Sequence, residues 1–112
     1  MSIEADVYKK LTYLSVPVYP VKIKQESDFP CIVYTVVSEV DKVAENAGEV
    51  AYKNYRFQVD VFSKSYKEAK ELKDKVIEAV TELGATDISV VDMWEEEVFL
   101  YRELIDFTIK GV

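Results

Sequence analysis

The stretch YRFQVDVFSKSYKEAKELKDKVIEAVTEL, residues 55–83, decides the fold because its hydrophobic period changes once, from two residues to three or four. Its first part alternates apolar and polar positions, as a strand with one buried face does. Ser65 and Glu68 follow at the spacing of a helix capping box. The second part places apolar residues on one helical face: Ala69, Leu72, Val76, Ala79, Val80 and Leu83. We therefore predict a strand over residues 52–63 and a helix that stops at Gly84.

The N-terminal half predicts one helix and two extended segments. Residues 2–14 carry an apolar stripe at spacings of four, four and three, which favours a helix. Two prolines exclude helix from residues 16–23, so we expect an extended, edge-like connection there. Residues 31–38 are mostly β-branched or aromatic and predict a strand with apolar side chains on both faces. Residues 39–51 break this pattern and predict a long exposed hairpin loop, with its mobility left open.

Two further extended segments, residues 87–94 and 99–111, complete the chain. The predicted fold class is α+β, with a mostly antiparallel sheet of four to five strands and two helices packed on one side of it. The predicted order is α-β-β-β-α-β-β. Because no shift in composition marks a boundary, we expect residues 1–112 to form a single domain.

Composition and charge exclude several classes of protein. The chain has 21 acidic and 14 basic residues, a formal net charge of −7, and no cluster of Lys and Arg that would neutralise phosphates. Tight nucleic-acid binding is therefore not expected. The acidic N-terminus is not a signal peptide. No apolar run approaches the roughly 18 residues that a membrane span needs, so no membrane partner is expected. A single cysteine allows no intrachain disulfide, which fits a reducing cytoplasm.

The residues that carry most enzyme chemistry are missing. The chain has no histidine, the commonest general base and metal ligand, so Ser-His-Asp and Cys-His sites cannot be built. Cys31 lies inside a predicted strand, where an inert buried thiol is expected. Asp87, Asp92 and residues 95–97 form the densest acidic cluster, but carboxylates that alternate along a strand do not converge as a hard cation requires. A solvated strand end is favoured over a weak cation site. We predict no catalytic, cofactor-binding or metal-binding residues.

Aromatic residues gather at the predicted strand ends: Phe62, Tyr66, Trp94, Phe99 and Tyr101. Packing in the core and its rim is the simpler interpretation, and a subunit interface is the alternative, since aromatic residues are enriched in interface cores. Phe62 falls on the polar face of its strand and therefore needs a cover, from this chain or from another. The residues that we predict for an oligomer interface are Phe62, Tyr66, Trp94, Glu45, Asn46 and Val50.

Several short motifs resemble one known family. They are FPCIVY at residues 29–34, VS at 37–38, YRFQVDVFSKS at 55–65, and Glu68, Ala69 and Leu72 in the helix that follows. In this order they resemble the tail completion, or tail terminator, proteins of long-tailed bacteriophages and prophages. The resemblance extends from the first helix to the last strands.

This resemblance implies a structural protein without enzymatic activity or cofactors. It implies a homo-oligomeric ring, typically a hexamer, that caps the tail tube, stops its polymerisation and joins tail to head. The partners would be the tail tube protein and a head-completion protein. The location would be the virion, and the host cytoplasm during assembly. DNA would pass through the ring, and an acidic lumen would not retain it.

Two other functions stay open at this point. The first is a small dimeric ligand-binding or regulatory α+β module, with a pocket beneath the loop at residues 39–51. The second, which the missing histidine disfavours, is a carboxylate-dependent enzyme.

Overall fold

The computed structural model describes residues 2–21, 29–43 and 50–111. In these parts of the chain, two helices and five strands follow one another in the predicted order. Their bounds are α1 Ile3–Thr12, β1 Val18–Pro20, β2 Cys31–Val43, β3 Val50–Ser63, α2 Tyr66–Glu82, β4 Thr86–Glu95 and β5 Leu100–Gly111. The α+β class predicted from the sequence is confirmed.

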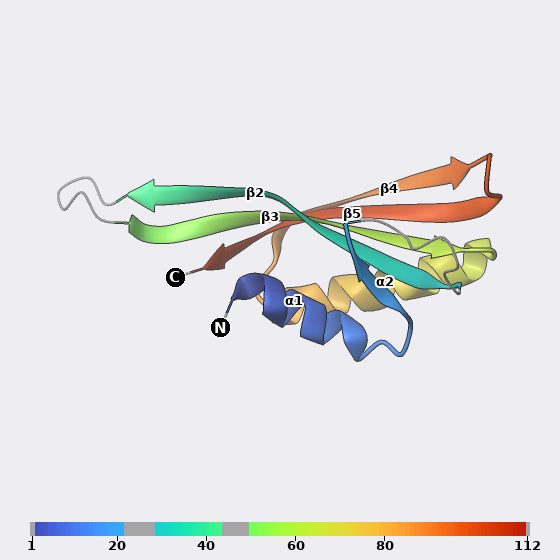
Figure 1. Ribbon diagram of the computed structural model, residues 1–112, viewed down its shortest axis with the longest axis horizontal. Coiled ribbons are helices and arrows are strands. Elements are labelled where there is room, and N and C mark those ends of the chain that lie inside the picture. Colours follow the sequence, from blue (N-terminus) through green and yellow to red (C-terminus); the bar gives the residue numbers. More distant parts are fainter. Residues whose placement is uncertain (1, 22–28, 44–49, 112) are drawn as a thin grey trace.

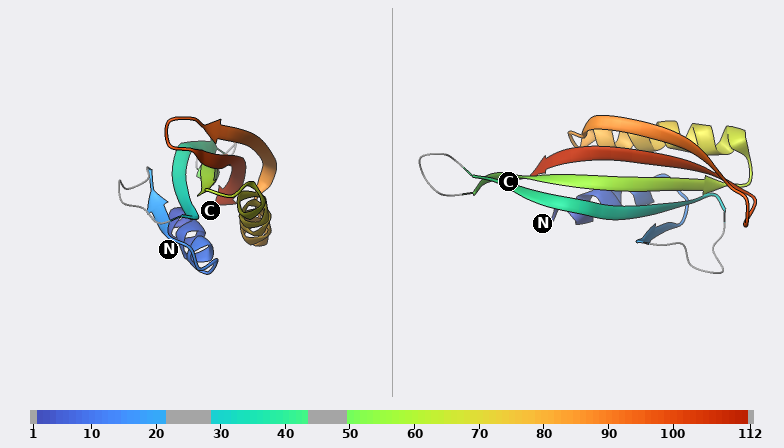
Figure 2. Two further views of the ribbon diagram at one scale, coloured as in Figure 1. Left: turned by 90° about the vertical axis from the view of Figure 1, so that its right-hand side faces the viewer. Right: turned by 90° about the horizontal axis from the view of Figure 1, so that it is seen from above.

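The five strands form one twisted sheet in the order β1-β2-β3-β5-β4. All neighbouring strands are antiparallel except β1 and β2, which are parallel. Both helices lie on the same side of the sheet, below it in Figure 1 and at the bottom of the end-on view in Figure 2. The predicted arrangement, a mostly antiparallel sheet with helices on one side, is therefore correct.

The core lies between the centre of the sheet and α2. Phe57, Val59 and Val61 on β3 are fully buried, as the period-two pattern predicts. Across the ladder to β5, Phe57 faces Phe107, and their rings stack 5.5 Å apart at an interplanar angle of 12°. The apolar stripe of α2 packs against this layer and is buried over most of its length. Burial of the two aromatic rings gives this layer a large share of the hydrophobic stabilisation.

The junction of β3 and α2 uses a variant of the predicted capping box. The backbone N–H of Glu68 donates to the Ser65 hydroxyl at 3.3 Å, as expected of an N-cap. In a standard capping box the Glu68 carboxylate would accept directly from the Ser65 N–H. Here the Ser63 hydroxyl connects the two: it donates to the Glu68 carboxylate at 2.7 Å and accepts from the Ser65 N–H at 3.1 Å. At the other end, Gly84 takes the left-handed conformation, with φ of 87°, that stops the helix.

The predicted loop at residues 39–51 is wrong at both ends. β2 continues to Val43 and β3 begins at Val50, with Val43 opposite Val50 in the ladder. Residues 44–49 lie outside the described residues. The amphipathic pattern fades here because no helix covers this part of the sheet, but antiparallel backbone pairing does not require that pattern. The β3–β5 ladder ends where Lys53 faces Gly111, so the β2–β3 hairpin projects beyond the body of a molecule 53 Å long.

The N-terminal predictions agree with the structure where it can be compared. Ser2 caps α1 by accepting from the Ala5 N–H at 3.0 Å. The predicted edge-like segment contains the three-residue strand β1, which pairs only with β2. Residues 22–23 of that prediction lie outside the described part of the chain.

Candidate subunit interface

Aromatic side chains gather at the end of the molecule where β4 turns into β5, on the right in Figure 1. The ring centre of Tyr101 is 4.8 Å from that of Trp94 and 5.4 Å from that of Tyr66. Phe99 packs edge-on against Trp94 at 6.3 Å. Tyr66, Trp94, Val98 and Phe99 are nevertheless exposed, Phe99 to 68%. We call Tyr66, Trp94, Val98, Phe99 and Tyr101 together the aromatic end.

Local backbone geometry explains why the aromatic end faces solvent. Trp94 and Tyr101 are direct partners in the β4–β5 ladder and so share one face of the sheet. Trp94 donates its indole N–H to the Glu96 carboxylate at 3.0 Å, and the side chain is still 45% exposed. Phe99 has φ of 53°, a left-handed conformation that is rare for a bulky residue and costs about 1–3 kcal/mol. The turn therefore holds a large apolar side chain in water in a strained conformation.

A charged cluster connects the aromatic end to the core. The Lys70 ammonium on α2 lies 2.5 Å from an Asp92 oxygen on β4 and 2.9 Å from a Glu103 oxygen on β5. It also lies 5.3 Å from the centre of the Tyr66 ring. Asp92 and Glu103 face each other across the ladder, and only Asp92 is exposed. Lys70 thus contacts two carboxylates near the N-terminal end of α2.

Burial sets the protonation of this cluster. Glu103 is 2% exposed, and burial, followed by the neighbouring Asp92 carboxyl, raises its pKa. The pKa of Asp92 is lowered, first by its hydrogen bond with Glu103 and then by Lys70. Asp92 and Glu103 together raise the pKa of Lys70. The arrangement favours a proton on Glu103 and a negative charge on Asp92. Among the described residues, no group of three or more His, Cys, Asp or Glu is placed to hold a metal ion.

Phe62 lies on the other face of the sheet, the one without helices. There the Arg102 guanidinium lies 5.5 Å from the centre of the Phe62 ring and binds Asp60 at 3.0 Å and Glu95 at 2.9 Å. Cys31 is the cross-strand partner of Phe62 and is fully buried, which raises the pKa of its thiol to about 11. The burial of Cys31 agrees with the sequence prediction. Phe62 therefore has part of its cover from its own chain.

Of the predicted interface residues, the structure brings Tyr66 and Trp94 together through Tyr101. Phe62 lies on the opposite face, and Val50 is the first residue of β3. Glu45 and Asn46 lie outside the described residues. Sequence reasoning missed the apolar edge of the sheet at β4, where Val90, Val91 and Met93 are exposed, Val91 to 51%. The available signal was the adjacent pair Val90 and Val91, which places apolar side chains on both faces of the strand.

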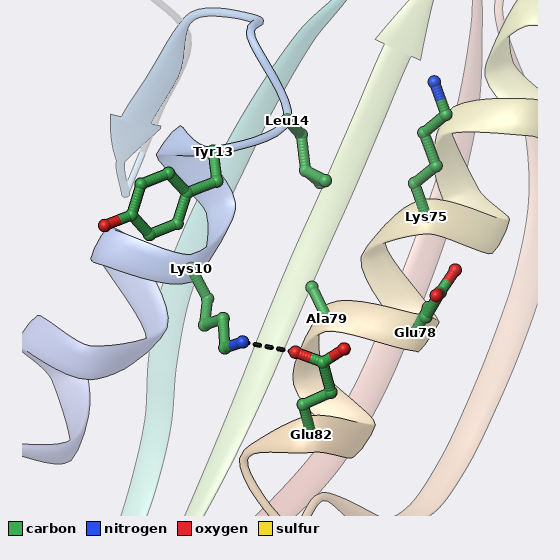
Figure 3. Close-up of a pocket in the computed structure, with 7 residues that line it drawn as sticks. All are labelled: Lys10, Tyr13, Leu14, Lys75, Glu78, Ala79 and Glu82. Carbon is green, nitrogen blue, oxygen red and sulfur yellow. Dashed lines mark hydrogen bonds and ion pairs between the residues drawn. The ribbon is translucent and has the colours of Figure 1, made fainter.

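Shallow grooves lie on the helix side of the described part of the chain. One of about 230 Å³ lies between α1 and α2 and is lined by Lys10, Tyr13, Leu14, Lys75, Glu78, Ala79 and Glu82. An ion pair between Lys10 and Glu82 crosses it (Figure 3). No helix in the described part of the chain is long and apolar enough to cross a membrane. The pocket predicted beneath residues 39–51 stays a prediction, since residues 44–49 are not described.

Comparison with known proteins identifies the family. The profile of the family described as tail completion protein gp17 matches residues 10–97, most of the chain. The chain belongs to this family. It is thus a structural tail protein of the virion, as the resemblance of its motifs implied.

A solved structure supports the fold. A chain from the structure described as the virion of a native gene transfer agent particle superposes with a TM-score of 0.67 at 14% sequence identity. The match covers 98% of this chain and 94% of that chain. No curated sequence matches this chain.

Proposed function

We propose that this tail completion protein assembles into a closed homo-oligomeric ring, a hexamer, that caps the tail tube and joins the tail to the head. The observation that carries the proposal is the family match together with apolar surface that no part of the described chain covers. Large exposed apolar patches on a small protein mark interaction sites. Here they lie on β4 and at the aromatic end, into which β4 leads.

In a ring of identical subunits, one surface of each subunit binds a different surface of the next subunit. The proposed ring therefore requires two different contact surfaces on each subunit. Tyr66 and Trp94, at the aromatic end, belong to one of them in this proposal. Phe62, Glu45, Asn46 and Val50 complete the proposed contact set. Residues 1–112 act as one domain in this proposal.

The proposed role needs no catalysis, and we propose that the protein is not an enzyme. A chain without histidine lacks the usual means of proton transfer. The proposed partners are the ring's own subunits, the tail tube protein and a head-completion protein. DNA passes through the lumen without tight binding, because the net charge of −7 opposes retention of a polyanion. The subunits would be present in the host cytoplasm during assembly.

Capping of tail tubes tests this function directly. Tail tube protein from the same virus is polymerised with and without the chain, and tube length and tube ends are examined by electron microscopy. We expect shorter tubes, each with a ring on one end. Unchanged tube lengths and bare ends would contradict the proposal, whatever the oligomeric state of the chain in isolation.

A further inference from the structure

Two stretches of strand have no neighbour on one side within the described chain. β4 pairs only with β5, so its outer edge, including the exposed residues Val90, Val91 and Met93, is open. β2 pairs with β1 only over Ile32–Tyr34, so from Thr35 onward the edge of β2 on the β1 side is open within the described chain. An open edge presents unpaired N–H and C=O groups, and natural proteins usually blunt or cover such an edge. β1 ends with a proline, but the apolar centre of β4 carries no such protection.

The strand directions of the two open stretches are compatible with each other. Because β2–β3, β3–β5 and β5–β4 are all antiparallel, β4 runs opposite to β2. When a second copy continues the sheet in the same orientation, its β4 therefore meets β2 antiparallel. We propose that β4 of one subunit pairs with the β2 stretch from Thr35 to Asp41 of the next, which makes one sheet continuous around the ring. This contact rests on the ring proposed above and adds a strand pairing to the contact residues named there.

Matching faces and charges select the register of this pairing. Val40 lies on the face without helices, beside Asn54, and the residues of β4 on that face are Ser89, Val91 and Met93. Placing Val40 opposite Val91 would set Glu39 against Asp92, and placing it opposite Met93 would set Asp41 against Asp92. Like charges directly opposite are destabilising.

Placing Val40 opposite Ser89 removes both conflicts. Glu39 then faces Val90 and Asp41 faces Ile88. Val36 and Val37, at the irregularity in β2, together face Asp92, and Thr35 faces Met93. The new ladder ends at Thr35, next to Tyr34, where pairing with β1 begins. The exposed Val37 and Val40 on β2 and Val90 and Val91 on β4 all lie within this new ladder.

This register also gives a ring that can close. Val40 pairs with Asn54 of β3. Ser89 pairs with Asp106 of β5, which in turn pairs with Gln58 of β3. Within one subunit the two positions are therefore offset by four residues along β3. At about 3.4 Å per residue the offset is about 14 Å, and four strands about 4.8 Å apart span about 19 Å. These values correspond to a strand tilt of about 35°. Closed barrels have tilts of about 35–45°, and this estimate does not depend on the number of subunits.

Disulfide cross-linking tests the contact in the full chain. Val40→Cys and Ser89→Cys are combined in one chain, in which the only native cysteine, Cys31, is buried. Within one molecule β3 and β5 separate the two sites by about 14 Å across the sheet, in addition to the offset along the strands. This is beyond the reach of a disulfide, so every bond formed joins two copies. Under mild oxidation we expect a ladder of covalent oligomers that ends at the closed ring.

The matched control moves one cysteine by a single residue. Val90→Cys replaces Ser89→Cys, which places the thiol on the helix-covered face of the same strand. We expect at least a tenfold lower yield of cross-linked dimer, at equal stability by circular dichroism. Equal yields from the two pairs, or no bond from either, would overturn the β4–β2 contact. Tube capping by the wild-type chain would still stand after that result, because it does not depend on which surfaces meet.

Discussion

The centre of the sheet and its β4 edge carry similar apolar side chains but differ in cover. On β3, Phe57, Val59 and Val61 are fully buried, because β2 and β5 flank the strand and α2 packs on it. On β4, Val90 and Val91 are exposed. β4 has a neighbouring strand on only one side within the described chain, α2 packs mainly over β3 and β5 and so leaves Val90 uncovered, and Val91 lies on the face without helices. Apolar side chains in a strand thus indicate a surface that needs a cover, but not which chain supplies the cover.

Replacing one large aromatic residue at the centre of the sheet, and one at the aromatic end next to β4, should give the largest difference in stability. Phe107→Ala removes a fully buried ring stacked on Phe57, and we expect a loss of about 3–5 kcal/mol in the free energy of unfolding. The matched change Phe99→Ala removes an exposed ring, and we expect less than about 0.5 kcal/mol. Urea denaturation followed by circular dichroism measures both. Similar losses for the two variants would mean that the aromatic end is part of the core.

The capping network at the start of α2 should give an intermediate effect. Ser65→Ala leaves the Glu68 N–H without its acceptor, and we expect a loss of about 1 kcal/mol in the free energy of unfolding. The matched control is Lys67→Ala, which changes an exposed side chain in the same helical turn. Thermal or urea unfolding measures both variants. Equal effects of the two changes would show that the hydroxyl does not cap the helix.

The buried carboxyl at the boundary of the two regions should make stability depend on pH. Because the pKa of Glu103 is raised on folding, its contribution is most favourable below the unfolded value of about 4.5 and weakens as pH rises through the folded value. Glu103→Gln keeps a donor for Asp92 but removes this titration. We therefore expect the stability of the variant relative to wild type to increase from about pH 4 to about pH 7.

Urea unfolding at several pH values measures this difference. Glu97→Gln removes the same charge from an exposed position and controls for the change in net charge. A variant whose relative stability fell as pH rose would have the wrong sign and would contradict the assignment to Glu103.

A charge on the open edge should have the smallest effect on stability and a clear effect on association. Val91→Lys changes an exposed residue, so we expect the free energy of unfolding to change by less than about 0.5 kcal/mol. Lysine on an edge strand opposes pairing with another strand, so self-association should weaken. Analytical ultracentrifugation measures it, with Tyr13→Lys, also highly exposed but on the helix side of the molecule, as the matched control. Equal association of the two variants would count against β4 as the contact.

The sequence was sufficient for the elements whose side chains alternate between solvent and core. The strand from Tyr52, the capped helix after Ser65 and the stop at Gly84 could all be predicted, because local patterns within about 30 residues specify them. The fold class followed from the order of these elements. The extension of β2 to Val43 could not be predicted in this way, because an exposed ladder is held by backbone pairing that leaves no hydrophobic period.

For the candidate interface too, some features could be predicted from the sequence and others only from the tertiary structure. Composition by itself determined that the sequence contains no histidine and many aromatic residues, and short motifs indicated the family. Only the tertiary structure showed that Tyr66 and Trp94 meet through Tyr101 while Phe62 lies on the other face beneath Arg102. It also showed that β4 is an edge strand. The physical reason is that strand order and side-chain cover depend on contacts between distant segments, whereas period and propensity are local properties of the chain.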